Sequence, residues 1–195
     1  MSLRSRGLVI WLTGLSGAGK STIAALLAEW LRTQRREVHV IDGDELRRAF
    51  SSDLGFNRED REKQNQRATF LADTLTLHHV DVIVSLISPY RASRDEARRR
   101  LPNFIEVFVN APLSVCVQRD PKGLYHKALA GGISDMTGLD APYERPIHPD
   151  VVVETARQSP RESVEQIIEF LEQHKGIDRR ITNAAAAAAR EVNRS

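Results

Sequence analysis

The segment GLSGAGKS at residues 14–21 constrains the fold of this chain more than any other. It matches the phosphate-binding pattern G-x-x-x-x-G-K-[ST] at every specified position, after an apolar stretch and before an amphipathic one. The glycines allow the backbone to curl, so that N–H groups and the N-terminus of the next helix point at phosphates. The pattern predicts a P-loop between a first strand and a first helix. The alternative is a glycine-rich turn that binds nothing.

This loop supplies the chemistry for binding ATP and Mg²⁺. We expect Lys20 to bridge the terminal phosphates and the Ser21 hydroxyl to coordinate the metal ion. The reaction class that follows is phosphoryl transfer from ATP. The loop residues predicted to bind the nucleotide are Gly14, Leu15, Ser16, Gly17, Ala18, Gly19, Lys20, Ser21 and Thr22.

Short β-branched apolar runs alternate with amphipathic stretches, a pattern typical of a parallel sheet covered on both faces. Strands are predicted at residues 8–13, 38–41, 80–86, 104–109 and 151–153. Helices are predicted at residues 20–32, 62–77, 93–100, 113–119 and 161–173. Right-handed crossovers then give an α/β fold, a three-layer doubly wound parallel five-stranded sheet of the P-loop NTPase type. Its ligands are expected at the carboxyl ends of the strands.

The length of 195 residues fits one catalytic domain, which we assign to residues 1–177. Residues 120–149 are rich in glycine and proline and show no convincing strand or long helix. A loop of this length in a compact domain is typical of a lid over an active site; we call it the lid segment. Residues 178–195 contain an alanine run and are interpreted as a low-complexity tail or a cloning remnant.

The net charge of +2 gives no overall field that would favour nucleic acid or a membrane as a partner. The apolar run at residues 8–12 is far shorter than the roughly 18 residues that span a bilayer. The single cysteine, Cys116, cannot form an internal disulfide and is expected to be a small buried apolar residue. These observations favour a cytoplasmic protein.

Two carboxylates, Asp42 and Asp44, follow the second predicted strand and should lie beside the terminal phosphate. Asp44 could orient or deprotonate an acceptor hydroxyl or reach Mg²⁺ through water, while Asp42 could support the loop. In the alternative interpretation Asp42 starts a turn and Asp44 caps a helix that begins at Glu45.

Arginines interleaved with Phe50 and Phe56 follow this strand, which is what a site for an adenine with a charged tail needs. The alternative is a solvated helical face. Ser88 ends the third predicted strand, either at the binding edge or in a simple turn. The arginines are Arg47, Arg48, Arg58, Arg61 and Arg67.

Together these motifs resemble those of the adenylyl-sulfate kinases, also called APS kinases. The resemblance runs in the family's order over residues 7–155 and is far more specific than the P-loop alone. The matching segments are GLSGAGKST from Gly14, DGD from Asp42, DLGF from Asp53, DR from Asp60, ISPYR from Ile87, FIEVFV from Phe104, RDPKGLY from Arg119 and TGLDAPYE from Thr137.

The resemblance implies transfer of the γ-phosphoryl group of ATP to the 3′-hydroxyl of adenylyl sulfate, with Mg²⁺. It implies catalytic roles for Lys20, Asp44 and Ser88, the last as a phosphoserine position, and adds Arg119 to the nucleotide site. It also implies a homodimer and association with, or fusion to, ATP sulfurylase. The substrate-binding residues that it implies are Asp42, Asp44, Arg47, Phe56, Arg61, Gln64, Asn65, Ile87, Ser88, Lys122, Met136 and Thr137.

Two positions depart from the family pattern. Gln64 stands where the family usually has Asn, although Asn65 follows directly, and Met136 stands where it tends to have Phe. A thioether covers an adenine with less directional stacking, so we expect weaker acceptor binding rather than lost chemistry. Two other functions compete with this one. They are a P-loop kinase of another small molecule and a non-catalytic nucleotide-binding module of a sulfate-activating protein.

Overall fold

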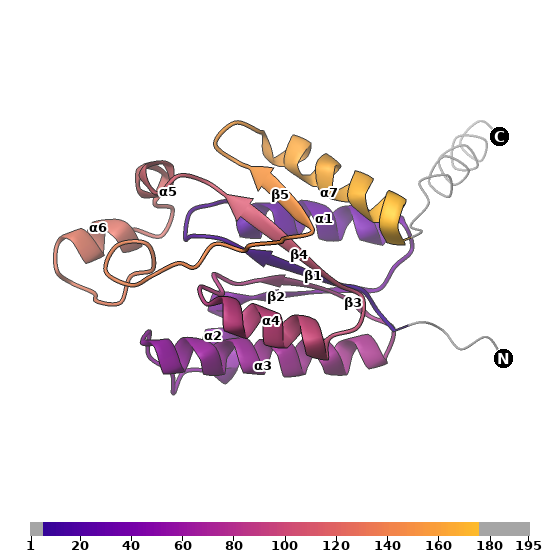
Figure 1. Ribbon diagram of the computed structural model, residues 1–195, viewed down its shortest axis with the longest axis horizontal. Coiled ribbons are helices and arrows are strands. Elements are labelled where there is room, and N and C mark those ends of the chain that lie inside the picture. The colour runs from indigo at the N-terminus through magenta and orange to yellow at the C-terminus, as the bar shows by residue number, and fades with distance from the viewer. Residues whose placement is uncertain (1–5, 176–195) are drawn as a thin grey trace, which may run out of the picture.

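The computed structural model describes residues 6–175, so the tail predicted at residues 178–195 lies outside the described residues. Within this range the strands form one parallel sheet in the order β2-β3-β1-β4-β5 (Figure 1). Each strand begins and ends within one residue of its predicted bounds, and the α/β fold is confirmed. The strands are β1 (Val9–Thr13), β2 (Val38–Asp42), β3 (Asp81–Ser85), β4 (Phe104–Asn110) and β5 (Val151–Glu154).

Helices cover both faces of the sheet (Figure 1). α1 (Lys20–Thr33) and α7 (Pro160–Lys175) pack on one face. The opposite face carries α2 (Gly43–Phe50), α3 (Arg58–Leu77) and α4 (Arg91–Arg100). α5 (Leu113–Arg119) and α6 (Leu124–Leu129) lie toward the end at which the strand arrows point. No helix in the described part of the chain is long and apolar enough to cross a membrane.

The core has two layers because side chains of a strand alternate between the two faces of the sheet. From β1, Ile10 and Leu12 pack toward α1 and α7, whereas Val9 and Trp11 pack toward α2, α3 and α4. Cys116 is buried in the first layer, as predicted. The last helix was predicted as an amphipathic stretch, and it does bury one apolar face, formed by Val164, Ile167, Ile168 and Leu171.

The turn after β2 differs from the alternative considered above. α2 begins at Gly43, and Asp42 is its N-cap, accepting hydrogen bonds from the Asp44 and Glu45 amides at 3.0 and 3.4 Å. The interpretation in which Asp44 caps a helix starting at Glu45 is therefore wrong. Since Asp42 performs the capping, the Asp44 side chain is left for other contacts.

Candidate active site

A cavity of about 730 Å³ opens at the carboxyl ends of the strands. Its wall combines the P-loop, the start of α2, part of α3, the segment after β3 and part of the lid segment. The predicted site residues Gly14, Leu15, Ala18 and Thr137 lie outside this wall. The predicted residues that line it are Ser16, Gly17, Gly19, Lys20, Ser21, Thr22, Asp42, Asp44, Arg47, Phe56, Arg61, Gln64, Asn65, Ile87, Ser88, Arg119, Lys122 and Met136.

The P-loop has the tight backbone that its glycines allow. Gly17 has φ 75°, and a Cβ there would lie 2.9 Å from the carbonyl oxygen of Cys116. Gly19, with φ 101°, is the N-cap of α1 and gives it no side-chain cap. By contrast, Asp42 caps α2 and Asn57 caps α3. The first turn of α1 therefore keeps its amide donors and positive dipole end for an anion.

Lys20 lies across this loop as a buried cation. Its Nζ donates to the carbonyl oxygens of Gly14 at 2.9 Å and Leu15 at 2.8 Å. Burial, followed by the nearby charge of Lys122, lowers the pKa of Lys20 to about 8. A desolvated ammonium that has only neutral carbonyls as partners would be stabilised by a phosphate oxygen, which agrees with the role in phosphate binding predicted for Lys20 from the sequence.

The Ser21 hydroxyl, at the end of the P-loop motif, lies next to the Asp42 carboxylate. Ser21 Oγ donates to Asp42 Oδ2 at 3.1 Å. Within residues 6–175 no cluster of three or more His, Cys, Asp or Glu side chains could hold a metal alone. Mg²⁺ in phosphoryl-transfer enzymes usually takes one or two protein ligands plus substrate phosphates and water, so this donor pair fits it.

The other half of the cavity presents an aromatic ring with two arginine side chains close to it. Phe56 is 54% exposed, and the guanidinium carbons of Arg47 and Arg61 lie 4.5 and 5.6 Å from the centroid of its ring. Arg47 donates to the Leu54 and Gly55 carbonyls at 2.9 and 2.8 Å. Arg61 donates to the carbonyls of Phe56 at 2.7 Å and Asp135 at 2.6 Å.

Neither Arg47 nor Arg61 forms an ion pair with any described carboxylate. Burial lowers the pKa of both groups, because the charges of nearby carboxylates, such as Asp60 near Arg47 and Asp135 near Arg61, offset their desolvation only in part. Two partly desolvated cations beside an open aromatic face are suited to a planar base carrying an anionic tail.

Asp44 and Lys122 form an ion pair that joins α2 to the start of the lid segment. Their side chains are 59% and 48% exposed, so water and ligands can reach both. Pairs this exposed contribute little to stability. The contact therefore leaves a carboxylate and an ammonium on the cavity wall that can exchange partners at little cost.

Gln64, which departs from the family pattern, and its neighbour Asn65 both line the cavity. Gln64 Nε2 donates to the Gly43 carbonyl at 3.3 Å, and Asn65 Nδ2 donates to the Arg61 carbonyl at 2.8 Å. Their amide oxygens are buried without a hydrogen-bond donor among the described residues. Met136, only 6% exposed, also lines the wall, whereas Thr137 is fully buried and does not line it.

Ser88 has a backbone and a hydroxyl that are both held in place. Its φ is 45°, and its Oγ accepts a hydrogen bond from Trp11 Nε1 at 3.0 Å. The Ile87 carbonyl accepts from Thr13 Oγ1 at 2.7 Å. Because Ser88 is only 2% exposed, its hydroxyl is less available than those of Ser21 and Thr22, which are exposed.

Thr155 is a cavity residue that the sequence reasoning missed. Its Oγ1 donates to the Ala18 carbonyl at 2.8 Å, and Arg119 donates to its Oγ1 at 3.2 Å and to its carbonyl at 2.5 Å. Arg119 also reaches the Gly17 carbonyl at 3.4 Å. Its position in the sequence could have identified it, because Thr155 directly follows β5 and therefore lies at the same edge of the sheet as Asp42.

A sequence model of the adenylylsulphate kinase family matches residues 6–154, most of the chain. The chain belongs to the adenylyl-sulfate kinase family. The adenylyl-sulfate kinase of Synechococcus sp. (strain JA-3-3Ab) is 52% identical over 169 residues, covering 87% of this chain and 96% of that protein. As a family member, the chain is a kinase with a P-loop nucleotide site.

Two further adenylyl-sulfate kinase relatives bear on structure and organisation. The solved APS kinase of Mycobacterium tuberculosis, in complex with AMPPNP and APS, superposes with a TM-score of 0.83 at 41% identity. That match covers 86% of this chain and 99% of the other. A probable bifunctional SAT/APS kinase of Sorangium cellulosum is 45% identical over 186 residues, which span 93% of this chain and 32% of that protein.

Proposed function

We propose that this chain transfers the γ-phosphoryl group of ATP to the 3′-hydroxyl of adenylyl sulfate, giving 3′-phosphoadenylyl sulfate and ADP. One observation carries the proposal. The P-loop with Lys20 and the Phe56 ring with its neighbours Arg47 and Arg61 line the same cavity, and Asp44 lies on its wall. One cavity thus holds both the groups suited to binding a phosphate donor and the groups suited to binding an adenylyl acceptor with an anionic tail.

In the proposed step Asp44 accepts the proton of the 3′-hydroxyl as that oxygen bonds to the γ-phosphorus. The bond from phosphorus to the β,γ-bridging oxygen breaks, and ADP leaves with the electron pair. Lys20 and the amides of α1 bind the phosphates, while Arg119 braces the P-loop through Gly17. Ser21 and Asp42 would hold Mg²⁺, which neutralises charge on the transferring phosphoryl group when it is bound.

The acceptor would be held by charge at one end and by stacking at the other. Arg47 and Arg61 bind the phosphosulfate, and Phe56 stacks on the adenine with Met136 over the other face. Supporting contacts would come from the Gln64 and Asn65 amides, from the Ile87–Ser88 backbone, and from Lys122 as the lid segment closes. A catalytic phosphoserine at Ser88 is not required, because direct transfer needs no such intermediate.

The deciding experiment is a coupled ADP-release assay with ATP, Mg²⁺ and adenylyl sulfate, run beside Lys20→Ala. The acceptor panel contains a sugar, a shikimate-type acid and a nucleoside monophosphate. We expect release with adenylyl sulfate alone, loss in Lys20→Ala, and loss when EDTA removes the metal. Release only with another acceptor, or nucleotide binding without any turnover, would reject the proposal. Ser88→Ala should keep most of the activity.

We also propose a cytoplasmic homodimer with ATP sulfurylase as a partner, on the strength of the family resemblance. The single free and buried thiol, Cys116, supports a reducing compartment. Light scattering coupled to size-exclusion chromatography tests the dimer: a monomer at micromolar concentration would reject it. Co-elution with purified ATP sulfurylase tests the partner.

A further inference from the structure

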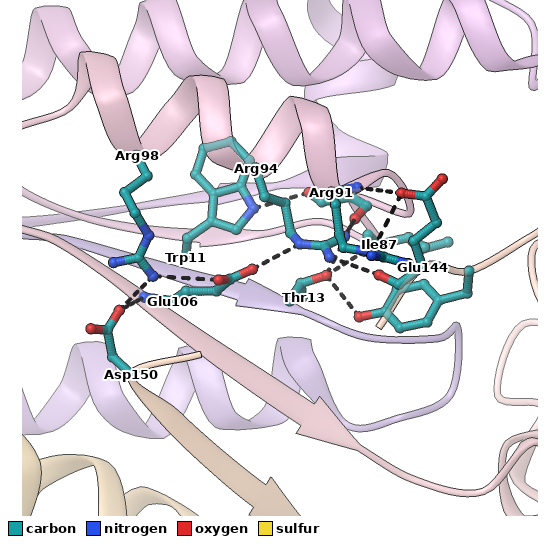
Figure 2. Close-up of polar contacts among 11 residues, drawn as sticks. Trp11, Thr13, Ile87, Arg91, Arg94, Arg98, Glu106, Glu144 and Asp150 are labelled. Carbon is teal, nitrogen blue, oxygen red and sulfur yellow. Dashed lines mark hydrogen bonds and ion pairs between the residues drawn. The ribbon is translucent and has the colours of Figure 1, made fainter. Parts of the chain in front are cut away.

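α4 carries an arginine that is buried almost completely. The Arg94 side chain is 2% exposed, and its ion-pair partner Glu106, in β4, is 8% exposed. Figure 2 shows the Arg94 guanidinium at the centre of a polar network between the sheet and α4. Since burying an unpaired guanidinium is costly, each of its contacts matters for the local structure.

Three nitrogen atoms of Arg94 donate to acceptors in three different parts of the chain. Nε donates to Glu106 Oε1 at 2.7 Å, Nη1 to the Ser88 carbonyl at 2.5 Å, and Nη2 to the Glu144 carbonyl at 2.7 Å. Ser88 lies in the cavity wall, and Glu144 lies near the end of the lid segment. The planar fork of an arginine can meet three such acceptors at once, whereas a lysine ammonium cannot reproduce that geometry.

The two carbonyl acceptors belong to segments that also bind each other. The Glu144 amide donates to the Pro89 carbonyl at 2.8 Å, and the Glu144 carboxylate accepts from the Arg91 amide at 2.9 Å. One residue earlier, the Tyr143 hydroxyl and Thr13 Oγ1 lie 2.9 Å apart. The end of the lid segment is therefore fastened to the residues that follow β3 and to the end of β1.

This fastening bears mainly on the acceptor half of the cavity, and it meets the P-loop only at its first residue, where the Gly14 amide donates to the Ile87 carbonyl at 3.5 Å. Ser88 has φ 45°, a strained value for a non-glycine residue that surrounding contacts must maintain. Upstream of Glu144, the lid segment contributes Met136 to the wall and the Asp135 carbonyl to Arg61. The P-loop has a separate brace, since Thr155 Oγ1 donates to the Ala18 carbonyl.

We propose that Arg94 is a positioning residue for the acceptor: it fixes the Ser88 wall and the end of the lid segment in one arrangement. This inference rests on the proposed function, because it assigns the acceptor to the half of the cavity that Arg94 supports. Arg94 itself is absent from the cavity wall. It acts through the Ser88 and Glu144 carbonyls, so its loss should change acceptor binding and leave ATP binding nearly intact.

The test compares Arg94→Lys with Arg98→Lys. Arg98 lies one turn further along α4 and shares Glu106 as a partner at 3.4 Å, with Asp150 as a second partner at 2.8 Å. In the described chain it makes no hydrogen bond to Ser88 or to residues 143–145. Both variants keep a positive charge beside Glu106, so both should fold, but only the first loses the two carbonyl contacts.

We expect Arg94→Lys to raise the KM for adenylyl sulfate about tenfold, as two lost hydrogen bonds would, and the KM for ATP by less than about twofold. Arg98→Lys should change both values by less than about twofold. A general loss of stability would not produce this split between the two substrates. Equal rises in both KM values for Arg94→Lys, or the same split in Arg98→Lys, would overturn the inference.

Hydrogen exchange separates this inference from the proposed function. The Glu144 amide should exchange about tenfold faster in Arg94→Lys than in the unmodified protein, and at an unchanged rate in Arg98→Lys. Unchanged exchange in Arg94→Lys overturns the inference, whereas an unmodified protein inactive on adenylyl sulfate rejects the function. If Arg94→Lys does not fold, Tyr143→Phe replaces it. Loss of the contact between the Tyr143 hydroxyl and Thr13 should raise the KM for adenylyl sulfate about threefold, and an unchanged KM counts against the inference.

Discussion

Phe56→Leu gives a direct test of the proposed acceptor site. Leucine keeps much of the apolar volume but removes the aromatic ring of Phe56, a residue that is 54% exposed and lines the cavity. Stacking of a base on an aromatic ring contributes about 1–3 kcal/mol. Because leucine retains some contact, we expect the lower part of this range, a rise of about 5- to 30-fold in the KM for adenylyl sulfate. The kcat should change little, since stacking is equal in the ground and transition states.

Phe70→Leu is the matched control. The Phe70 ring is 62% exposed and lies 5.8 Å from the guanidinium carbon of Arg100, but it is outside the cavity wall. Each Arg–ring contact contributes about 0.5–1 kcal/mol, so Phe56→Leu should lower the free energy of unfolding by about 1–2 kcal/mol and Phe70→Leu by about half of that.

The assay is coupled ADP release at saturating ATP with varied adenylyl sulfate, beside denaturant unfolding of each variant. An acceptor KM that rises less than about twofold in Phe56→Leu, or equally in Phe70→Leu, would refute the placement of the adenine on this ring. A larger loss of kcat than of acceptor affinity would show that the ring acts in the chemical step instead.

Three further predictions follow from the site. The kcat/KM for ATP should fall about tenfold per pH unit above about pH 8, because Lys20 there loses the charge that binds phosphate, and a flat activity profile across pH 7–10 would contradict this prediction. The contribution of Lys20 to the free energy of unfolding should instead rise between pH 8 and 10.5, because the unfolded chain keeps the lysine proton up to a higher pH than the folded protein does. Asp44→Asn should lower kcat by about 100-fold or more with little change in melting temperature, because the side chain is exposed; unchanged kcat would exclude it as the base. Met136→Phe should tighten acceptor binding about threefold through a second stacking face, and an unchanged acceptor KM would count against Met136 as a cover for the adenine.

The sheet was predictable because its strands are short apolar runs bounded by charge or turn residues, and its central strands are buried on both faces. β1 and β4 are fully buried except for Asn110. The same reasoning placed Asp42 and Asp44 at the binding edge. It could not decide which of them caps α2, because either carboxylate is a good N-cap and the choice depends on where the strand releases the chain.

The polar network around Arg94 was not predictable. Arg94 lies in a helix so rich in arginine that its sequence predicts a solvent-exposed helix. Glu106 lies within an apolar run whose sequence predicts a strand and nothing more. Their pairing depends on how α4 crosses the sheet, which local periodicity does not encode. α6 was also missed, because a helix of six residues inside a segment rich in turn residues has almost no periodic signal.

The hydrogen bond from Thr155 Oγ1 to the Ala18 carbonyl joins residues 137 positions apart. The P-loop leaves the ribosome early, but this bond and the contacts from Arg119 complete its support only after β5 has been made. At about 5–20 residues per second, roughly 7–27 s separate the two events. During synthesis the nucleotide site therefore exists first as an unsupported loop, and a chain that stops before Thr155 would carry the phosphate-binding motif without the bond that holds its backbone in place.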